Sequence, residues 1–221
     1  MFDISKLALK LPNFLTNEEC DGLINEFEQR KEEASNEGSY HASSHKLVES
    51  SYQIVKLLPR SQNFNLIREK TKLAIDIWIN YLDQPKYFYT KILKEKLKFS
   101  QIYRIMKYEK GSYIHPHTDH EIGTYGSISF NLNNDYKGGE FKFFNGNYEI
   151  KLNKGDVLIF PADYFWVHEV TPITEGVRYS LNSFLIDMPY PSNKTSSHLR
   201  KIIGEDQFRS SPPEELLGPY N

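Results

Sequence analysis

The stretch YEKGSYIHPHTDH at residues 108–120 decides how the second half of the chain is interpreted. It starts in an aromatic and apolar run and ends with His117 and Asp119, two positions apart. On a β-strand, side chains at i and i+2 point to the same face, so this imidazole and this carboxylate can reach one ion. His168 and then Arg178 follow in two later runs of the same texture.

Short β-branched and aromatic runs, separated by turn residues, surround this stretch from about residue 86 onwards. Asn145-Gly146, between two aromatic runs, is a strong signal for a hairpin turn. Eight short strands predict a double-sheet jelly roll, in which strand ends from distant segments meet. The predicted strands are 99–108, 113–119, 126–133, 139–144, 148–152, 156–160, 165–170 and 177–186.

The first part of the chain is helical in pattern. Thr16-Asn-Glu-Glu19 is a capping box before an amphipathic helix over 17–33, and a second helix is predicted over 63–82. The Ser-rich stretch 34–51 between them is predicted to be a loop, either a mobile lid over substrate or an inert surface loop. The expected fold is mainly β with flanking helices.

We expect a single domain over 1–221. Its parts are helical support and a substrate-side loop in 1–97, a jelly-roll catalytic core in 98–186 and a C-terminal tail in 187–221.

Composition limits the partners. The formal net charge is 27 − 29 = −2, which gives no electrostatic reason to expect nucleic acid or an anionic membrane. Cys20 is the only cysteine, which excludes an intrachain disulfide and a zinc-thiolate site. No signal-peptide pattern and no apolar run of about 20 residues is present. We therefore expect a cytoplasmic protein, and the sequence carries no signal for an oligomeric state.

The set His117, Asp119 and His168 predicts a metal site. Two imidazoles and one carboxylate without a thiolate suit Fe(II), and zinc with three protein ligands and a water is the competitor. A zinc hydrolase also needs a general-base carboxylate beside the metal. Arg178 instead offers a planar fork for a dicarboxylate, and Ser180 shares its strand face.

Four segments resemble prolyl 4-hydroxylase-like 2-oxoglutarate/Fe(II) dioxygenases. Residues 108–119 resemble the family's Y-x-x-G and H-x-D segment, and Gly138-Gly-Glu140-Phe resembles its GGE turn. Lys154-Gly-Asp156-Val-Leu-Ile-Phe160 is similar to the strand before the second histidine, and residues 14–24 are similar to the entry of the N-terminal helix. The resemblance spans roughly residues 11–186.

This resemblance implies a double-stranded β-helix (cupin-like) core and a hydroxylase that uses Fe(II), 2-oxoglutarate and O2, with ascorbate as an additional requirement to test. His117, Asp119 and His168 would be the metal ligands and catalytic set, and Arg178 with Ser180 would hold 2-oxoglutarate. The products would be succinate and CO2. The expected substrate is a prolyl residue of a peptide or protein; a lysyl residue, a free amino acid or a small metabolite is the alternative.

The chain departs from the family at Ser127-Ile-Ser129-Phe-Asn131, where the family often has an inward tyrosine and where Ser127, Ser129 and Asn131 are expected to face inward here. Asn131, Tyr108 or Tyr103 is expected to assist 2-oxoglutarate binding, and the two tyrosines cannot both face inward without a bulge. The residues expected to line the substrate pocket are His115, Tyr113, Asn182 and Phe184.

Two hypotheses from other classes remain open at this point. A cupin-like zinc hydrolase or isomerase would bind zinc and ignore 2-oxoglutarate. A non-enzymatic jelly-roll binding module would use the metal for structure. Arg178 discriminates between them and the hydroxylase, because only the hydroxylase needs it.

Overall fold

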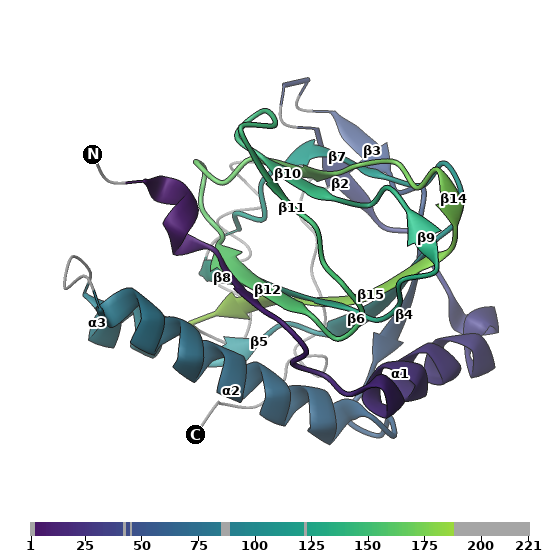
Figure 1. Cartoon of the computed structure of the whole chain (residues 1–221), viewed down its shortest axis with the longest axis horizontal. Helices are drawn as coiled ribbons and strands as arrows, with labels where there is room; N and C mark the ends of the chain where they lie inside the picture. The colour runs from purple at the N-terminus through teal and green to yellow at the C-terminus, as the bar shows by residue number, and fades with distance from the viewer. Residues whose placement is uncertain (1–2, 42, 45, 85–88, 122, 188–221) are drawn as a thin grey trace, which may run out of the picture.

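Two antiparallel β-sheets face each other, and helices cover the outer face of the larger sheet (Figure 1). The computed structural model describes residues 3–41, 43–44, 46–84, 89–121 and 123–187. The larger sheet has the order β1-β12-β8-β15-β6-β4, with β5 paired to β15, and the smaller sheet has the order β11-β10-β13-β7. The predicted mainly β fold with helices outside it is confirmed.

The strands of the larger sheet are β1 (Leu9–Leu11), β4 (Gln53–Leu57), β5 (Phe99–Ser100), β6 (Tyr103–Tyr108), β8 (Thr124–Asn131), β12 (Val157–Pro161) and β15 (Arg178–Ile186). Those of the smaller sheet are β7 (Ile114–His117), β10 (Phe141–Phe143), β11 (Tyr148–Ile150) and β13 (His168–Val170). Two separate ribbons pair β2 (Gly38–Tyr40) with β3 (Leu47–Glu49) and β9 (Tyr136–Lys137) with β14 (Glu175–Gly176). The α-helices are α1 (Asn17–Gln29), α2 (Phe64–Asp83) and α3 (Thr90–Lys96), and 3-10 helices span Ile4–Leu7 and Lys31–Glu33.

Alternation along β8 separates the hydrophobic core from the interior of the barrel. Ile128 and Phe130 point outwards and are buried in the cluster that also holds the apolar residues of α1 and α2. Ser127, Ser129 and Asn131 point towards the smaller sheet, as the period of two requires. The helices therefore stabilise one face of the sheet and leave the opposite face free to carry polar groups.

A second apolar cluster lies between the two sheets. Phe141 and Phe143 of β10 meet Phe160 of β12 there, together with Trp166. Phe143 packs edge-on against both Phe160 and Trp166, with ring centroids 5.1 and 5.6 Å apart. This cluster holds the sheets together beside the polar interior and gives one wall of it an apolar surface.

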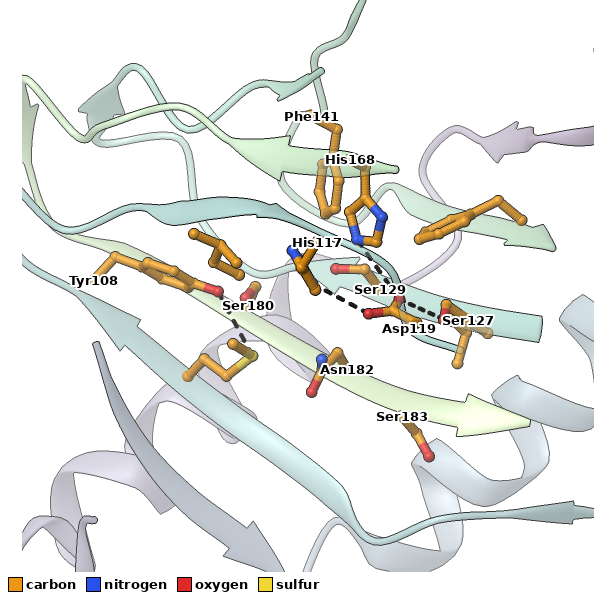
Figure 2. Close-up of a pocket in the computed structure, with 14 residues that line it drawn as sticks. Tyr108, His117, Asp119, Ser127, Ser129, Phe141, His168, Ser180, Asn182 and Ser183 are labelled. Carbon is orange, nitrogen blue, oxygen red and sulfur yellow. Dashed lines mark hydrogen bonds and ion pairs between the residues drawn. The ribbon is translucent and has the colours of Figure 1, made fainter. Parts of the chain in front are cut away.

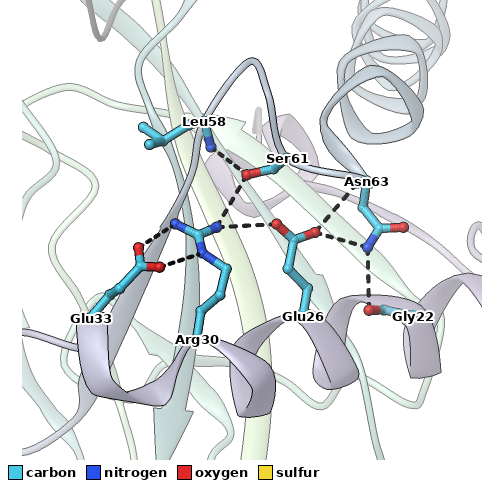
Figure 3. Close-up of polar contacts among 7 residues, drawn as sticks. All are labelled: Gly22, Glu26, Arg30, Glu33, Leu58, Ser61 and Asn63. Carbon is cyan, nitrogen blue, oxygen red and sulfur yellow. Dashed lines mark hydrogen bonds and ion pairs between the residues drawn. The ribbon is translucent and has the colours of Figure 1, made fainter.

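A polar network joins α1 to the start of α2 (Figure 3). Glu26, only 6% exposed, accepts hydrogen bonds from the Asn63 side chain at 2.9 Å and from the Asn63 backbone at 3.3 Å. Arg30 pairs with Glu26 at 3.1 Å and with Glu33 at 2.7 Å. A carboxylate at the N-terminus of a helix is stabilised by the free backbone N–H groups there. Glu26 therefore fixes how the two helices meet.

We expect Glu26→Ala to lower the free energy of unfolding by about 2–3 kcal/mol, because it removes the buried acceptor that the partly buried Arg30 and the Asn63 donors have in common. Glu33→Ala is the matched control. It removes the more exposed partner of the same arginine and should lower the free energy of unfolding much less. Urea denaturation of both variants measures the difference, and equal losses would contradict the role given to Glu26.

Several predicted elements differ from those observed. The run 99–108 is divided into β5 and β6, the run 113–119 ends as a strand at His117, and the run 165–170 becomes a strand only at His168. The stretch 34–51, predicted to be a loop, contains the β2–β3 ribbon. Helix α3 was not predicted, because its seven residues are too few to show a helical period.

Two local predictions are confirmed. Asn145 and Gly146 lie at positive φ in the turn that joins β10 to β11, and Phe143 pairs with Tyr148 across that turn. The capping box of α1 is present, with Thr16 and Glu19 each bonded to the backbone of the other.

The tail expected over 187–221 lies, from residue 188 onwards, outside the described residues. No helix among the described residues is long and apolar enough to cross a membrane.

Candidate functional site

Two histidines meet where β13 lies beside β7. His168 is directly opposite His117 in the antiparallel register, and the ring centroids are 4.3 Å apart. Asp119 directs its carboxylate at both rings, with Oδ1 3.2 Å from His117 Nε2 and Oδ2 3.5 Å from His168 Nε2. One ligand atom from each of the three residues lies within 4.8 Å of the others (Figure 2). The sequence prediction that the three residues meet is confirmed.

The prediction that Asp119 shares a strand with His117 is wrong. The last pair of the β7–β13 ladder is His117 with His168, and the chain leaves the sheet after it. Asp119 therefore approaches from the following loop rather than from the next position on the strand face. This approach places its carboxylate across both imidazoles.

Backbone carbonyls orient both imidazoles. His117 Nδ1–H donates to the carbonyl of His115 at 2.9 Å, and His168 Nδ1–H donates to the carbonyl of Trp166 at 3.0 Å. These bonds select the tautomer that leaves Nε2 without a proton and directed at Asp119. Phe143 and Phe160 pack against the His168 ring at 5.4 and 5.0 Å. The rings are thus held in the orientation that a metal ion requires.

The charge state of the group also suits a cation. Burial acts to raise the pKa of Asp119, but His168, His117 and Ser127 together hold that pKa well below its usual range. Burial lowers the pKa of His168 to about 4, against the opposing effect of Asp119. Burial acts to lower the pKa of His117 as well, yet its contact with Asp119 raises it. A cation bound here would meet an ionised carboxylate and the Nε2 atoms of two imidazoles.

Ser127 supports the carboxylate from β8 by donating its hydroxyl to Asp119 Oδ2 at 2.6 Å. We expect Ser127→Ala to weaken binding of Mn(II) or Fe(II) about tenfold to 100-fold, the usual effect of losing a hydrogen bond to a metal ligand. Ser129→Ala is the matched control, since Ser129 lines the same pocket from the same strand, whereas the hydrogen bond to Asp119 comes from Ser127. Equal affinities of the two variants, measured by calorimetry, would exclude this supporting role.

A pocket of about 370 Å³ opens beside the triad. Ser180 and Asn182 of β15 and Met106 and Tyr108 of β6 form the wall opposite the triad (Figure 2). Burial raises the pKa of Tyr108 to about 12, although the Arg178 charge opposes the shift. Tyr108 is therefore a neutral hydrogen-bond donor at neutral pH.

Arg178 lies buried at the end of this wall, 1% exposed. Its guanidinium packs on Tyr108 at 5.0 Å and on Phe141 at 5.6 Å from the ring centroids. Gly139, at φ +75°, makes room for it, because a Cβ there would lie 3.0 Å from Arg178 Cδ. Among the described residues, Arg178 Nη1 has no hydrogen-bond partner. A buried cationic donor without a partner is costly unless a ligand supplies an anion, which fits the far carboxylate of a dicarboxylate.

Asn131 holds Arg178 in place instead of facing the pocket as a free group. Its side-chain oxygen accepts from Arg178 Nε at 3.1 Å and from the Tyr136 hydroxyl at 2.9 Å. Its amide nitrogen donates to the backbone carbonyls of Asn133 and Leu152. Tyr136 was not identified from the sequence, because no sequence motif links it to Asn131 or Arg178. Asn131 and Tyr136 orient the arginine so that Nη1 remains available.

Of the other predicted residues, only some line the pocket beside the triad. Tyr108 and Asn182 line the pocket, as expected. Tyr103 points to the opposite face of β6 and packs against Phe64 of α2, so it cannot reach a ligand in the barrel. Phe184 is not among the residues that line the pocket beside the triad.

His115 and Tyr113 line a second hollow, of about 260 Å³, between β7 and the segment 48–52. Ile114 lines this hollow and the pocket beside the triad. The two spaces are therefore neighbours along β7.

The segment that contains the donor set and the anion site matches a known family in sequence. Residues 103–186 match the model of the 2OG-Fe(II) oxygenase superfamily. The chain is 27% identical over 129 residues to a PKHD-type hydroxylase from Idiomarina loihiensis, an alignment that covers 54% of this chain and 56% of that protein. It is 38% identical over 69 residues to a PKHD-type hydroxylase from Cupriavidus pinatubonensis, covering 29% of each chain. The chain thus spans about half or less of the length of these curated relatives.

Solved structures share the fold. A prolyl-4-hydroxylase from Pseudomonas putida superposes with a TM-score of 0.60 at 17% identity, covering 82% of this chain and 92% of that one. A prolyl hydroxylase from Trichoplax adhaerens, solved with a hypoxia inducible factor peptide fragment, gives a TM-score of 0.60 at 15% identity, covering 83% of this chain and 84% of that one. These superpositions confirm the predicted double-stranded β-helix.

Proposed function

Because the chain belongs to the 2OG-Fe(II) oxygenase superfamily, we propose that it is a hydroxylase that consumes 2-oxoglutarate and O2. One observation carries this proposal. Two imidazoles and a carboxylate face a pocket wall that includes Tyr108, and behind Tyr108 packs Arg178, whose Nη1 has no partner among the described residues. Such an arrangement suits a metal and an acidic co-substrate bound side by side.

Each part of the pocket has its own role in this proposal. His117, Asp119 and His168 hold Fe(II), while Arg178 and Ser180 hold the far carboxylate of 2-oxoglutarate. When bound, Fe(II) would activate O2, the oxidant for C–H hydroxylation, while 2-oxoglutarate would be oxidised by the same O2 to succinate and CO2. The protein orients the ligands through the backbone carbonyls beside each histidine. It also excludes water with the aromatic wall around His168.

The zinc hydrolase alternative lacks one component. Among the described residues that line the pocket, Asp119 is the only carboxylate, and it belongs to the metal group itself. A metal-bound water would therefore have no separate general base there. This supports the hydroxylase over the hydrolase.

A prolyl residue of a peptide or protein is the first substrate to test, since the Trichoplax enzyme was solved with a peptide. A free amino acid is the second, because a further arginine lies inside the barrel, as described in the next subsection.

The test is succinate formation from 2-oxoglutarate with Fe(II) and ascorbate, measured with proline-containing peptides and free amino acids. We expect substrate-dependent succinate that disappears without O2 or without 2-oxoglutarate. Intact, metal-loaded protein that forms no succinate with any substrate, and takes up no O2 in the presence of 2-oxoglutarate, would refute the proposal.

A further inference from the structure

A second arginine lies inside the barrel, on the wall opposite the triad. Arg104 of β6 points to the same face as Met106 and Tyr108, both of which line the pocket. It is 8% exposed and is the direct cross-strand partner of Asn182, which also lines the pocket. The proposed roles of iron and 2-oxoglutarate leave this arginine unused.

The guanidinium of Arg104 is held loosely for a buried cation. Its contacts with Glu37 are 3.2 and 3.5 Å long. Its contacts with the Gln101 side chain and the Ile102 carbonyl are 3.4 and 3.5 Å long. Charge-assisted hydrogen bonds to a carboxylate are usually about 2.7–2.9 Å long. Each guanidinium nitrogen of Arg104 therefore has a partner, but at a distance longer than is usual for a charge-assisted hydrogen bond.

An acceptor without a partner lies next to this cation. Asn182 Oδ1 is buried and has no hydrogen-bond partner among the described residues. Figure 2 shows the Asn182 side chain on β15, directed into the pocket from the wall opposite His117 and His168. Unpaired buried polar atoms are rare, and a ligand is one explanation for them.

The strand register relates Arg104 and Asn182 to the metal group. Phe184 packs against the Arg104 guanidinium, whose Cζ lies 5.0 Å from the centroid of the Phe184 ring. The next cross-strand row, Phe184 with Ser127, leads directly to Asp119, to which Ser127 donates. Asn182 thus lies one same-face row from Ser127, the hydrogen-bond partner of Asp119, and Arg104 lies beside Asn182 on the neighbouring strand.

We propose that Arg104 binds the carboxylate of the substrate and that Asn182 Oδ1 accepts a hydrogen bond from the adjacent nitrogen, so that the enzyme selects substrates with a free α-carboxylate. A free amino acid and the C-terminal residue of a peptide share this chemistry. In a free amino acid, the ammonium group also meets Glu37. The side chain then extends past Asn182 towards the metal group. This inference rests on the proposed function for its reaction and names the substrate class.

Ligand-observed NMR on the metal-free protein tests the inference without turnover. The probes are proline and other free amino acids, their N-acetyl amides, and short peptides with a free or an amidated C-terminus. We expect binding of the forms with a free carboxylate and at least tenfold weaker binding after amidation. Free amino acids that bind while peptide acids do not identify the first source, and the reverse result identifies the second. Amidated forms that bind as well as the acids would overturn the proposal.

Arg104→Met should weaken binding of the carboxylate probes at least tenfold. Lys107→Met is the matched control, because Lys107 is also ion-paired but lies on the outer face of the same strand, with Glu28. Arg104→Lys should retain part of the affinity, since it keeps the charge but loses the planar fork. Asn182→Ala provides a second variant that leaves the ion pair in place and should also weaken binding. Wild-type affinity in Arg104→Met would refute the role of this arginine.

A separate measurement distinguishes this inference from the proposed function. Arg104→Met should keep the wild-type affinity for 2-oxoglutarate, because Arg178 is intact. Carboxylate binding in a protein that never consumes 2-oxoglutarate would support the Arg104 site and refute the hydroxylase. Succinate formation driven equally well by amidated peptides would support the hydroxylase and refute the Arg104 site.

Discussion

His117→Ala is expected to abolish metal binding and all succinate formation. It removes one of two neutral imidazole ligands and leaves the buried Asp119 without its partner at 3.2 Å. The loss of metal affinity should exceed the roughly tenfold to 100-fold that follows from losing a supporting hydrogen bond. Equilibrium dialysis with Mn(II) and a succinate assay measure the two effects.

His115→Ala is the matched control for this prediction. The backbone carbonyl of His115 orients His117, so removal of the His115 side chain leaves that hydrogen bond in place and removes an edge-to-face ring contact at 5.9 Å. The control should bind metal as the wild type does. Metal binding that survives His117→Ala, or fails equally in both variants, would show that the triad does not hold the metal.

Arg178→Met is expected to weaken 2-oxoglutarate binding without loss of metal binding. Truncation of one partner in a buried, hydrogen-bonded charge pair costs about 2–5 kcal/mol, or about 30-fold to 5,000-fold in the dissociation constant. The variant loses the Nε hydrogen bond to Asn131, but Asn131 Oδ1 still accepts from Tyr136, so we expect the fold to be kept. Calorimetric titration of 2-oxoglutarate into the Mn(II) protein measures the change.

Arg178→Lys refines the same prediction. A lysine keeps the positive charge but cannot form the bidentate fork, so its affinity for 2-oxoglutarate should fall between those of Arg178 and Arg178→Met. Unchanged binding in Arg178→Met would instead favour a protein that ignores 2-oxoglutarate, as the zinc hydrolase and the binding module would.

The residues that carry the chemistry were predictable from the sequence because each occurs within a local pattern. His117, Asp119 and Arg178 lie in or next to runs whose period of two indicates which side chains face inwards. The same period correctly assigned Ser127, Ser129 and Asn131 to the interior of the barrel. Parity, however, gives only the face, and the loop position of Asp119 shows that a ligand can also come from beyond a strand end.

The contacts between distant segments were not predictable. Asn131 was expected to touch 2-oxoglutarate, but Tyr136 and Arg178 take up its side-chain oxygen. No sequence motif includes Arg104, and its proposed role follows only from its position beside Asn182 and Glu37. The ribbon β2–β3 was not predicted within its polar, Ser-rich stretch, because short strands outside a hydrophobic core need no alternation of apolar residues.

The most direct test of the account is an anaerobic titration of 2-oxoglutarate into the Fe(II)-loaded protein, followed by visible absorption. We expect a weak charge-transfer band that grows to saturation in the wild type, is absent in His117→Ala, and requires much higher 2-oxoglutarate in Arg178→Met. Wild-type protein that holds Fe(II) but develops no band at any concentration of 2-oxoglutarate would contradict the central claim.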